Sequence, residues 1–155
     1  SFSSKREGDL VEKKKITLNE LGYENIAHKV SFWQGDACNL KPNFNSYDLI
    51  MATNLIDRLY NPKLFLETIH KRLNSDGILM ITSPYSWQES STKKEMWLGG
   101  FVDKNGNEIK TLNTLKKILN ENFELIHLKD IEFVIKESAR KFQHTIAQCS
   151  IWKKR

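Results

Sequence analysis

Cysteine is scarce in this chain, and long apolar runs are absent. Its 155 residues include two cysteines, Cys38 and Cys149, which are too few for a disulfide framework and have no metal-ligand spacing. No apolar stretch approaches the roughly 20 residues that cross a bilayer, and the polar first residues do not form a signal peptide. We therefore expect a cytoplasmic α/β domain with no metal site and no membrane partner.

A concentrated basic region is also missing. The net charge is +5, but the Lys and Arg residues are dispersed in short groups without interleaved aromatic residues. These groups are Lys13–Lys15, Lys93–Lys94, Lys116–Lys117 and Lys153–Arg155. A protein that binds nucleic acid would need a contiguous basic face, so we expect no nucleic-acid partner.

The most informative stretch is Ser46–Leu59, SYDLIMATNLIDRL. Tyr47–Ala52 is apolar without alternation, which predicts a parallel strand that is buried on both faces. Polar residues return at Thr53–Arg58, and ligands of open α/β sheets bind beyond the carboxyl ends of the strands. We therefore place candidate chemistry at Asn54 and Asp57. The alternative is that both residues only form caps and turns.

A helix and a second strand follow. Asn61 is a candidate N-cap for a helix over 62–73, and Gly77–Ser83 reads as another buried strand. Two apolar strands that are joined by a helix form a βαβ unit, so this pair should be parallel with a right-handed crossover.

The flanking segments complete the predicted topology. We expect a helix over Lys13–Leu21 that ends at Gly22, a strand over Val30–Asp36, and a helix that is capped by Thr111. The segments 123–135, interrupted at 129–130, and 144–152 should form an antiparallel pair, because their connection is too short for a crossover.

The predicted fold is therefore a doubly wound α/β domain over 1–155, of which the chain supplies the C-terminal part. Its sheet is mostly parallel, with a reversed final edge strand. We expect that the N-terminal strand and the glycine-rich turn after it are missing.

The loop 83–106 is long, polar and aromatic, and connections of this length are usually functional or disordered. Trp87, Trp97 and Phe101 could form the wall of a pocket for a flat substrate, or they could pack a compact loop. The pair Gly99-Gly100 favours a close backbone approach or a hinge.

Two further positions remain open between a functional and a structural reading. Gly35-Asp36-Ala37 follows a predicted strand, where a carboxylate and the next backbone N–H can bind an adenine edge. A plain turn is the alternative. His144 follows Lys141-Phe142-Gln143 at a strand entry and is the least ordinary of the four histidines, although most single histidines are structural.

Taken together, these segments resemble the class I S-adenosylmethionine methyltransferases. Longer blocks are similar to the C-terminal methyltransferase module of the ovothiol-synthesis enzymes. These blocks are FWQGDACNLKP (32–42), YDLIMATNLIDRLYNP (47–62), SPYSW (83–87), WLGGF (97–101) and RKFQH (140–144). The match extends from about Glu7 to Trp152, but the family's glycine-rich motif does not appear in this chain.

The resemblance implies a reaction and a set of roles. The chain would use S-adenosylmethionine to methylate an imidazole nitrogen of 5-thiohistidine. An iron-dependent sulfoxide synthase module would precede it in the same protein. The donor-binding residues would be Gly35, Asp36, Ala37, Asn54 and Leu55. Asp57 and His144 would be catalytic, because either could fix the tautomer of the imidazole.

The implied substrate-binding residues are Arg58, Tyr85, Trp87, Trp97, Gly100, Phe101 and Lys141, and no metal is implied. Two other functions remain open. The chain could be a non-catalytic methyltransferase-like scaffold or binding module, or it could methylate another small molecule.

Overall fold

The computed structural model describes all residues, Ser1–Arg155, and they form two compact units. Unit 1 comprises Ser1–Gln34 and Glu132–Thr145, and unit 2 comprises Gly35–Ile131 and Ile146–Arg155. Each unit is described by itself. None of the helices has the length and apolar character that crossing a membrane requires.

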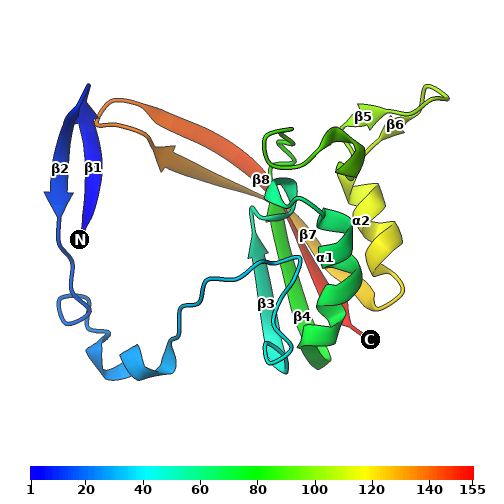
Figure 1. The fold of residues 1–155 in the computed structure, drawn as a ribbon, viewed down its shortest axis with the longest axis horizontal. Coiled ribbons are helices and arrows are strands. Elements are labelled where there is room, and N and C mark those ends of the chain that lie inside the picture. Colours follow the sequence, from blue (N-terminus) through cyan, green and yellow to red (C-terminus); the bar gives the residue numbers. More distant parts are fainter. The chain divides into compact units, whose positions relative to one another are not determined.

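Unit 1 begins with a hairpin. Strands β1 (Phe2–Glu7) and β2 (Leu10–Lys14) pair antiparallel around Gly8, whose φ is +53° (Figure 1). The predicted helix over Lys13–Leu21 is wrong, because its first residues belong to β2 and pair across the hairpin. The left-handed backbone expected at Gly22 is present, with φ +73°.

The predicted strand over Val30–Asp36 is also wrong. A short 3-10 helix, Glu24–Lys29, is followed by irregular backbone, and the side chain of Phe32 is 93% exposed. A strand exists only where a neighbour accepts its backbone hydrogen bonds, and no strand of the structure pairs with this segment. The turn at Gly35 therefore does not follow a strand.

A mixed four-stranded sheet forms the centre of unit 2, although the segments 132–136 and 142–145 of its last two strands belong to unit 1. Its strands are β3 (Tyr47–Thr53), β4 (Leu73–Ser83), β8 (Phe142–Lys154) and β7 (Phe123–Lys136), in that order across the sheet. The parallel pairing of β3 with β4 is confirmed. The reversal of the last strand is confirmed as well, because β8 pairs antiparallel with β4. The reversed strand β8 is not at the edge that was expected for it, because it lies between β4 and β7 and β7 forms the edge. Strand β7 runs without the expected interruption.

Two helices pack against this sheet (Figure 1). Helix α1 (Pro62–Thr68) continues as a 3-10 helix to Arg72, and Asn61 Oδ1 accepts a hydrogen bond from Leu64 N at 3.0 Å, so the predicted cap is confirmed. Helix α2 spans Thr111–Leu119. Its N-cap is Lys110, without a side-chain cap, so the cap predicted at Thr111 is wrong.

One face of the sheet carries the core. The register of β4 with β8 places Leu79 opposite Trp152, and both side chains are fully buried. Side chains of α1 and α2 pack against them. The buried members from the helices are Phe65, Leu66, Leu115 and Leu119. Burial of each such side chain contributes about 1.5–3 kcal/mol.

The other face of the sheet is open. Leu49 and Met51 on β3 are 52% and 58% exposed, whereas Ala52 on the helix side is buried. The strand itself is correctly predicted, but burial on both faces is wrong. The physical reason is that β3 is an edge strand and helices cover only one face.

Candidate functional site

The polar segment after β3 forms a buried hydrogen-bond cluster around Asp57. This carboxylate is 1% exposed. Its Oδ1 accepts from the Ser83 hydroxyl at 2.9 Å, and its Oδ2 accepts from Arg58 Nη1 at 2.9 Å and from the Ser86 hydroxyl at 3.1 Å. Three donors compensate for the desolvation of a buried carboxylate. Asp57 therefore binds the loop that follows β4, and its direct contact with a substrate stays a prediction.

Arg58 belongs to the same cluster. Its Nη1 also donates to Ser86 O at 2.7 Å, and its Nη2 donates to the Ser86 hydroxyl at 3.0 Å. The guanidinium thus binds the backbone and the side chain of one loop residue together. Its predicted role as a counter-charge for substrate stays a prediction, because these contacts already use two of its nitrogens.

The loop after β4 holds Tyr85 in an uncommon conformation. Its φ is +53°, in the left-handed region that non-glycine residues rarely adopt. The Ser83 hydroxyl accepts from Tyr85 N at 3.0 Å while donating to Asp57. Backbone strain of this kind persists where the surroundings fix it, and it concentrates at functional sites.

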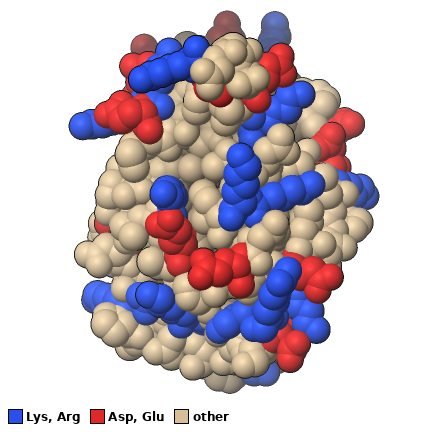
Figure 2. All heavy atoms as spheres, turned by 90° about the vertical axis from the view of Figure 1, so that its right-hand side faces the viewer, with Lys and Arg blue, Asp and Glu red and all other residues tan.

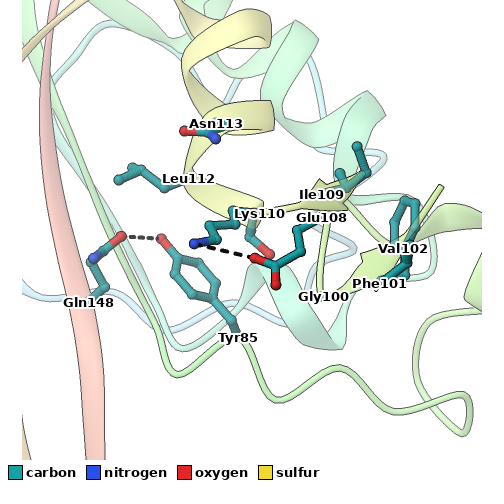
Figure 3. A pocket seen from close by; sticks show the side chains of 11 residues that line it. Tyr85, Gly100, Phe101, Val102, Glu108, Ile109, Lys110, Leu112, Asn113 and Gln148 are labelled. Carbon is teal, nitrogen blue, oxygen red and sulfur yellow. Dashed lines mark hydrogen bonds and ion pairs between the residues drawn. The ribbon is translucent and has the colours of Figure 1, made fainter. Parts of the chain in front are cut away.

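A cavity of about 580 Å³ lies beside Tyr85, beyond the carboxyl end of β4 (Figure 3). This position agrees with the general location of ligand sites in open α/β sheets. Its lining residues are Tyr85, Gly100, Phe101, Val102, Glu108, Ile109, Lys110, Thr111, Leu112, Asn113 and Gln148. A mostly apolar wall with a few polar groups is typical of small-molecule pockets.

The polar groups of the cavity lie on opposite sides of the Tyr85 ring (Figure 3). On one side, the Tyr85 hydroxyl donates to Gln148 Oε1 at 3.0 Å. On the other side, Lys110 Nζ lies 3.5 Å from Glu108 Oε2 in an exposed ion pair. Burial and the nearby carboxylates of Asp130 and Asp57 raise the pKa of Tyr85 to about 12. The phenol is therefore a neutral donor at physiological pH.

The raised pKa of Tyr85 predicts a loss of stability at high pH. Between about pH 10 and pH 12, the unfolded chain releases this proton and the folded chain keeps it. The stabilisation is complete below pH 10, and the free energy of unfolding falls by about 3 kcal/mol at most as the pH rises through this window. In an absorbance titration, Tyr85→Phe should remove an ionisation near pH 12, and Tyr47→Phe should leave it. An unchanged titration in Tyr85→Phe would contradict the assignment.

The two tryptophans of the long loop do not line the cavity. The buried Trp87 donates from Nε1 to the Thr111 hydroxyl at 3.1 Å and stacks on Trp97, with 6.2 Å between ring centroids. Trp97 Nε1 donates to Thr92 O at 2.8 Å. These contacts match the packed-loop alternative. A role of either indole in substrate binding stays a prediction, whereas Gly100 and Phe101 do line the cavity.

The glycine pair makes the expected close approach. A Cβ on Gly99 would collide with the backbone nitrogen of Thr111, at the start of α2. Gly100 has φ +81°, and its N–H donates to Ile109 O at 2.7 Å. The loop backbone is thereby fixed against the helix that forms one side of the cavity.

The residues that the sequence predicts to bind the methyl donor occupy two turns of unit 2. In one turn, Asp36 Oδ1 accepts from Cys38 N at 2.9 Å and Oδ2 accepts from the Tyr60 hydroxyl at 3.0 Å. This hydrogen bond to Asp36 is the main reason why the pKa of Tyr60 is raised. In the other turn, Asn54 has φ +49°, and its Oδ1 accepts from the Thr82 hydroxyl at 3.0 Å.

The other donor-binding candidates flank these two turns. Gly35 and Ala37 are the chain neighbours of Asp36, and Leu55 packs partly buried against the core of unit 2.

His144 and Lys141 belong to unit 1. The exposed His144 has its Nε2 3.1 Å from Glu132 Oε2 on the neighbouring strand. Lys141 Nζ pairs with Glu137 at 2.6 Å, which raises the pKa of the lysine. The catalytic role of His144 and the substrate-binding role of Lys141 stay predictions.

The surface of the α2 side is of mixed charge. Figure 2 shows Lys and Arg side chains interspersed with Asp and Glu on this face. Unit 2 contains ion pairs between surface charges, as in Lys63 with Glu67 at 3.5 Å and Lys153 with Asp76 at 3.0 Å.

Sequence reasoning missed four polar residues that line the cavity or hold its loop. Glu108, Lys110, Asn113 and Gln148 come from segments without a motif. One signal could have found Gln148, since it is the amide in the otherwise mostly apolar segment Ile146–Cys149. Only the pairing of β8 with β4, which places Gln148 opposite Ser83, puts it beside the loop.

The comparisons with known proteins agree with this fold. A search of curated proteins finds no match. Among solved structures, a Listeria monocytogenes protein assigned as an S-adenosylmethionine dependent methyltransferase has a TM-score of 0.56 at 12% identity, over 89% of this chain and 75% of that one. An S-adenosylmethionine-dependent methyltransferase from Methanosarcina mazei has a TM-score of 0.51 at 15% identity, over 77% of this chain and 65% of that one. At these identities the likeness shows the fold.

Another similar structure comes from work on the conversion of a disulfide bond into a thioacetal group during echinomycin biosynthesis. It has a TM-score of 0.56 at 10% identity, over 88% of this chain, which spans only 62% of that structure. The family model described as "Methyltransferase domain" matches residues 6–145. The match covers most of the sequence, and the mixed sheet with its reversed last strand agrees with it. The chain therefore belongs to the methyltransferase domain family.

Proposed function

We propose that this chain is part of an S-adenosylmethionine-dependent N-methyltransferase that acts on a small imidazole thiol, 5-thiohistidine. The observation that carries the proposal is the cavity beside Tyr85, in a chain of the methyltransferase family. The sequence blocks SPYSW and WLGGF supply Tyr85, Gly100 and Phe101 to this cavity. The resemblance that suggested the substrate therefore includes residues that line one site.

The cavity has the size and character that a small ring requires. Its volume of about 580 Å³ lies within the usual range for small-molecule sites. Phe101 and Leu112 offer apolar surface to a ring, and the exposed pair of Glu108 with Lys110 offers both signs of charge. An amino acid head group carries the complementary charges.

The residues of unit 2 also fit a methyl donor. Asp36 is an exposed carboxylate with two of its four acceptor sites in use, so it can still accept from an exocyclic amine. Asn54 and Leu55 follow the carboxyl end of β3, where ligands of such sheets bind. We propose that these residues hold the donor.

The chain's main tasks in this reaction are alignment and exclusion of water. S-adenosylmethionine would supply an activated methyl group: a neutral imidazole nitrogen would form the new N–C bond as the bond from the methyl to the sulfonium sulfur breaks, S-adenosylhomocysteine would leave, and the other N–H proton of the ring would pass to water. Tyr85 and the apolar wall of the cavity orient the ring. The packed loop around Trp87 keeps that wall rigid.

The setting of the enzyme is also part of the proposal. The resemblance to ovothiol-synthesis enzymes favours a preceding iron-dependent sulfoxide synthase module, whose product would be the source of the thiol. We propose a cytoplasmic protein, because both cysteines are free and thiols persist in a reducing compartment.

The first experiment is a calorimetric titration of S-adenosylhomocysteine into the natural protein that carries this sequence. We expect a dissociation constant on the order of 10 μM, or about −7 kcal/mol. Asp36→Asn should weaken binding by about tenfold, since an amide nitrogen cannot accept a hydrogen bond. Asp76→Asn, on the surface near Lys153, is the matched control. If the wild-type protein does not bind the product, the proposal is wrong and a scaffold role becomes the better hypothesis.

A further inference from the structure

We propose that Gln148 selects the substrate, by donating a hydrogen bond from Nε2 to an acceptor atom attached to the outside of the substrate ring. In 5-thiohistidine this acceptor is the sulfur. The inference rests on the proposed function, since it names the group that recognises the proposed substrate. It gives a binding role to a residue on the reversed strand β8.

The orientation of the Gln148 amide is fixed by Tyr85. The phenol donates to Oε1 at 3.0 Å, and its raised pKa of about 12 keeps it protonated. The amide oxygen is therefore occupied by the protein. The two N–H groups of Nε2 remain the free donors of this side chain.

These donors have no acceptor within the protein, and they belong to a residue that lines the cavity. The neighbouring wall is largely apolar, with Phe101, Ile109 and Leu112 among its members. Gln148 is half-buried, so water can solvate these N–H groups while the cavity is empty. A ligand that displaces this water leaves them unpaired, at a cost, unless it supplies an acceptor atom.

Both partners of this contact are held by rigid elements. Gln148 lies in the sheet, opposite Ser83 at the end of β4. The Ser83 hydroxyl in turn accepts from Tyr85 N and donates to Asp57. Asp57 is thus a positioning residue for Tyr85. Binding groups that are fixed in this way discriminate well between similar ligands.

The chemistry of the reaction favours the exocyclic atom as the acceptor. The ring nitrogen that receives the methyl group needs its lone pair for the new bond. A hydrogen bond donated to that nitrogen would occupy the same lone pair and oppose attack. Gln148 can assist recognition without this penalty only if it binds a different acceptor.

The test compares two ligands that differ only in the sulfur. Gln148→Glu keeps the shape and the acceptor for Tyr85, but it removes both N–H donors. We expect 5-thiohistidine to bind about tenfold more weakly to this variant, and histidine to change by less than about twofold. Calorimetry of the natural protein, saturated with S-adenosylhomocysteine, measures both constants. Because the new carboxylate also repels an ionised sulfur, Gln148→Met, which removes the N–H donors without adding a charge, is measured alongside and should show the same difference between the two ligands.

Gln143→Glu, an exposed position on the same strand, makes the same chemical change outside the cavity and should alter neither constant. Equal weakening of both ligands in Gln148→Glu would overturn the inference, as would unchanged binding of 5-thiohistidine. If the wild-type protein does not bind S-adenosylhomocysteine, the proposed function is overturned, and the inference with it. Retained product binding in the variant shows that it is folded.

Discussion

Replacing Asp57 by alanine should lower the free energy of unfolding by about 3 kcal/mol. The carboxylate accepts three hydrogen bonds, and its removal leaves the hydroxyl of Ser83 buried without an acceptor. Arg58 and Ser86 lose a partner as well, although the guanidinium keeps its bonds to backbone oxygens. Urea denaturation followed by circular dichroism measures the change, with the slope of the transition as a check on two-state unfolding.

Two further variants separate the charge from the shape. Asp57→Asn retains one acceptor oxygen and should lose about half as much stability. Ser86→Ala removes one donor to Asp57 and one acceptor for Arg58, and it should cost about 1 kcal/mol. If Asp57→Ala were as stable as the wild type, the cluster would not hold the loop and its role would have to be sought in direct contact with substrate.

Gly99→Ala should be the most disruptive single methyl addition in the chain, with a loss of about 3 kcal/mol. The added Cβ would collide with Thr111 N and would lie 2.7 Å from the carbonyl carbon of Lys110. Both atoms are backbone, so neither can move aside as a flexible side chain would. The loop must then separate from the start of α2, which also forms one side of the cavity. Thermal denaturation should therefore show a clear fall in the midpoint.

Gly106→Ala is the matched control. Its Cβ would meet open space, and the only cost is the left-handed backbone at φ +83°, about 1–2 kcal/mol. A loss in Gly99→Ala no greater than in this control would contradict the close packing of the loop on the helix.

The strands of the βαβ unit show why part of the fold could be predicted. Tyr47–Ala52 and Gly77–Ser83 are apolar runs that are joined by a capped helix, and this local pattern permits only a parallel pair. The final antiparallel pair followed from a connection that is too short for a crossover. In each case the information lies within a few neighbouring residues of the chain.

The failed predictions have a shared physical cause. Val30–Asp36 has the composition of a strand, but a strand needs a partner and no strand pairs with it here. Lys13–Leu21 has weak helical periodicity, and the cross-strand pairing of β2 with β1 overrides it at its start. Both outcomes depend on contacts with distant or absent neighbours.

The site shows the same division. The sequence by itself determined the parallel unit, because residue type and spacing encode it locally, and its resemblance to known methyltransferases indicated the family. It also marked Asp57, Tyr85 and Gly100 as candidate site residues. Only the tertiary structure decided that Asp57 binds a loop, that the tryptophans pack that loop, and that Gln148 faces Tyr85. The contact between Gln148 and Tyr85 depends on the register between strands that lie far apart in the chain. The loop contacts of Asp57 depend on the need of a buried carboxylate for hydrogen-bond donors.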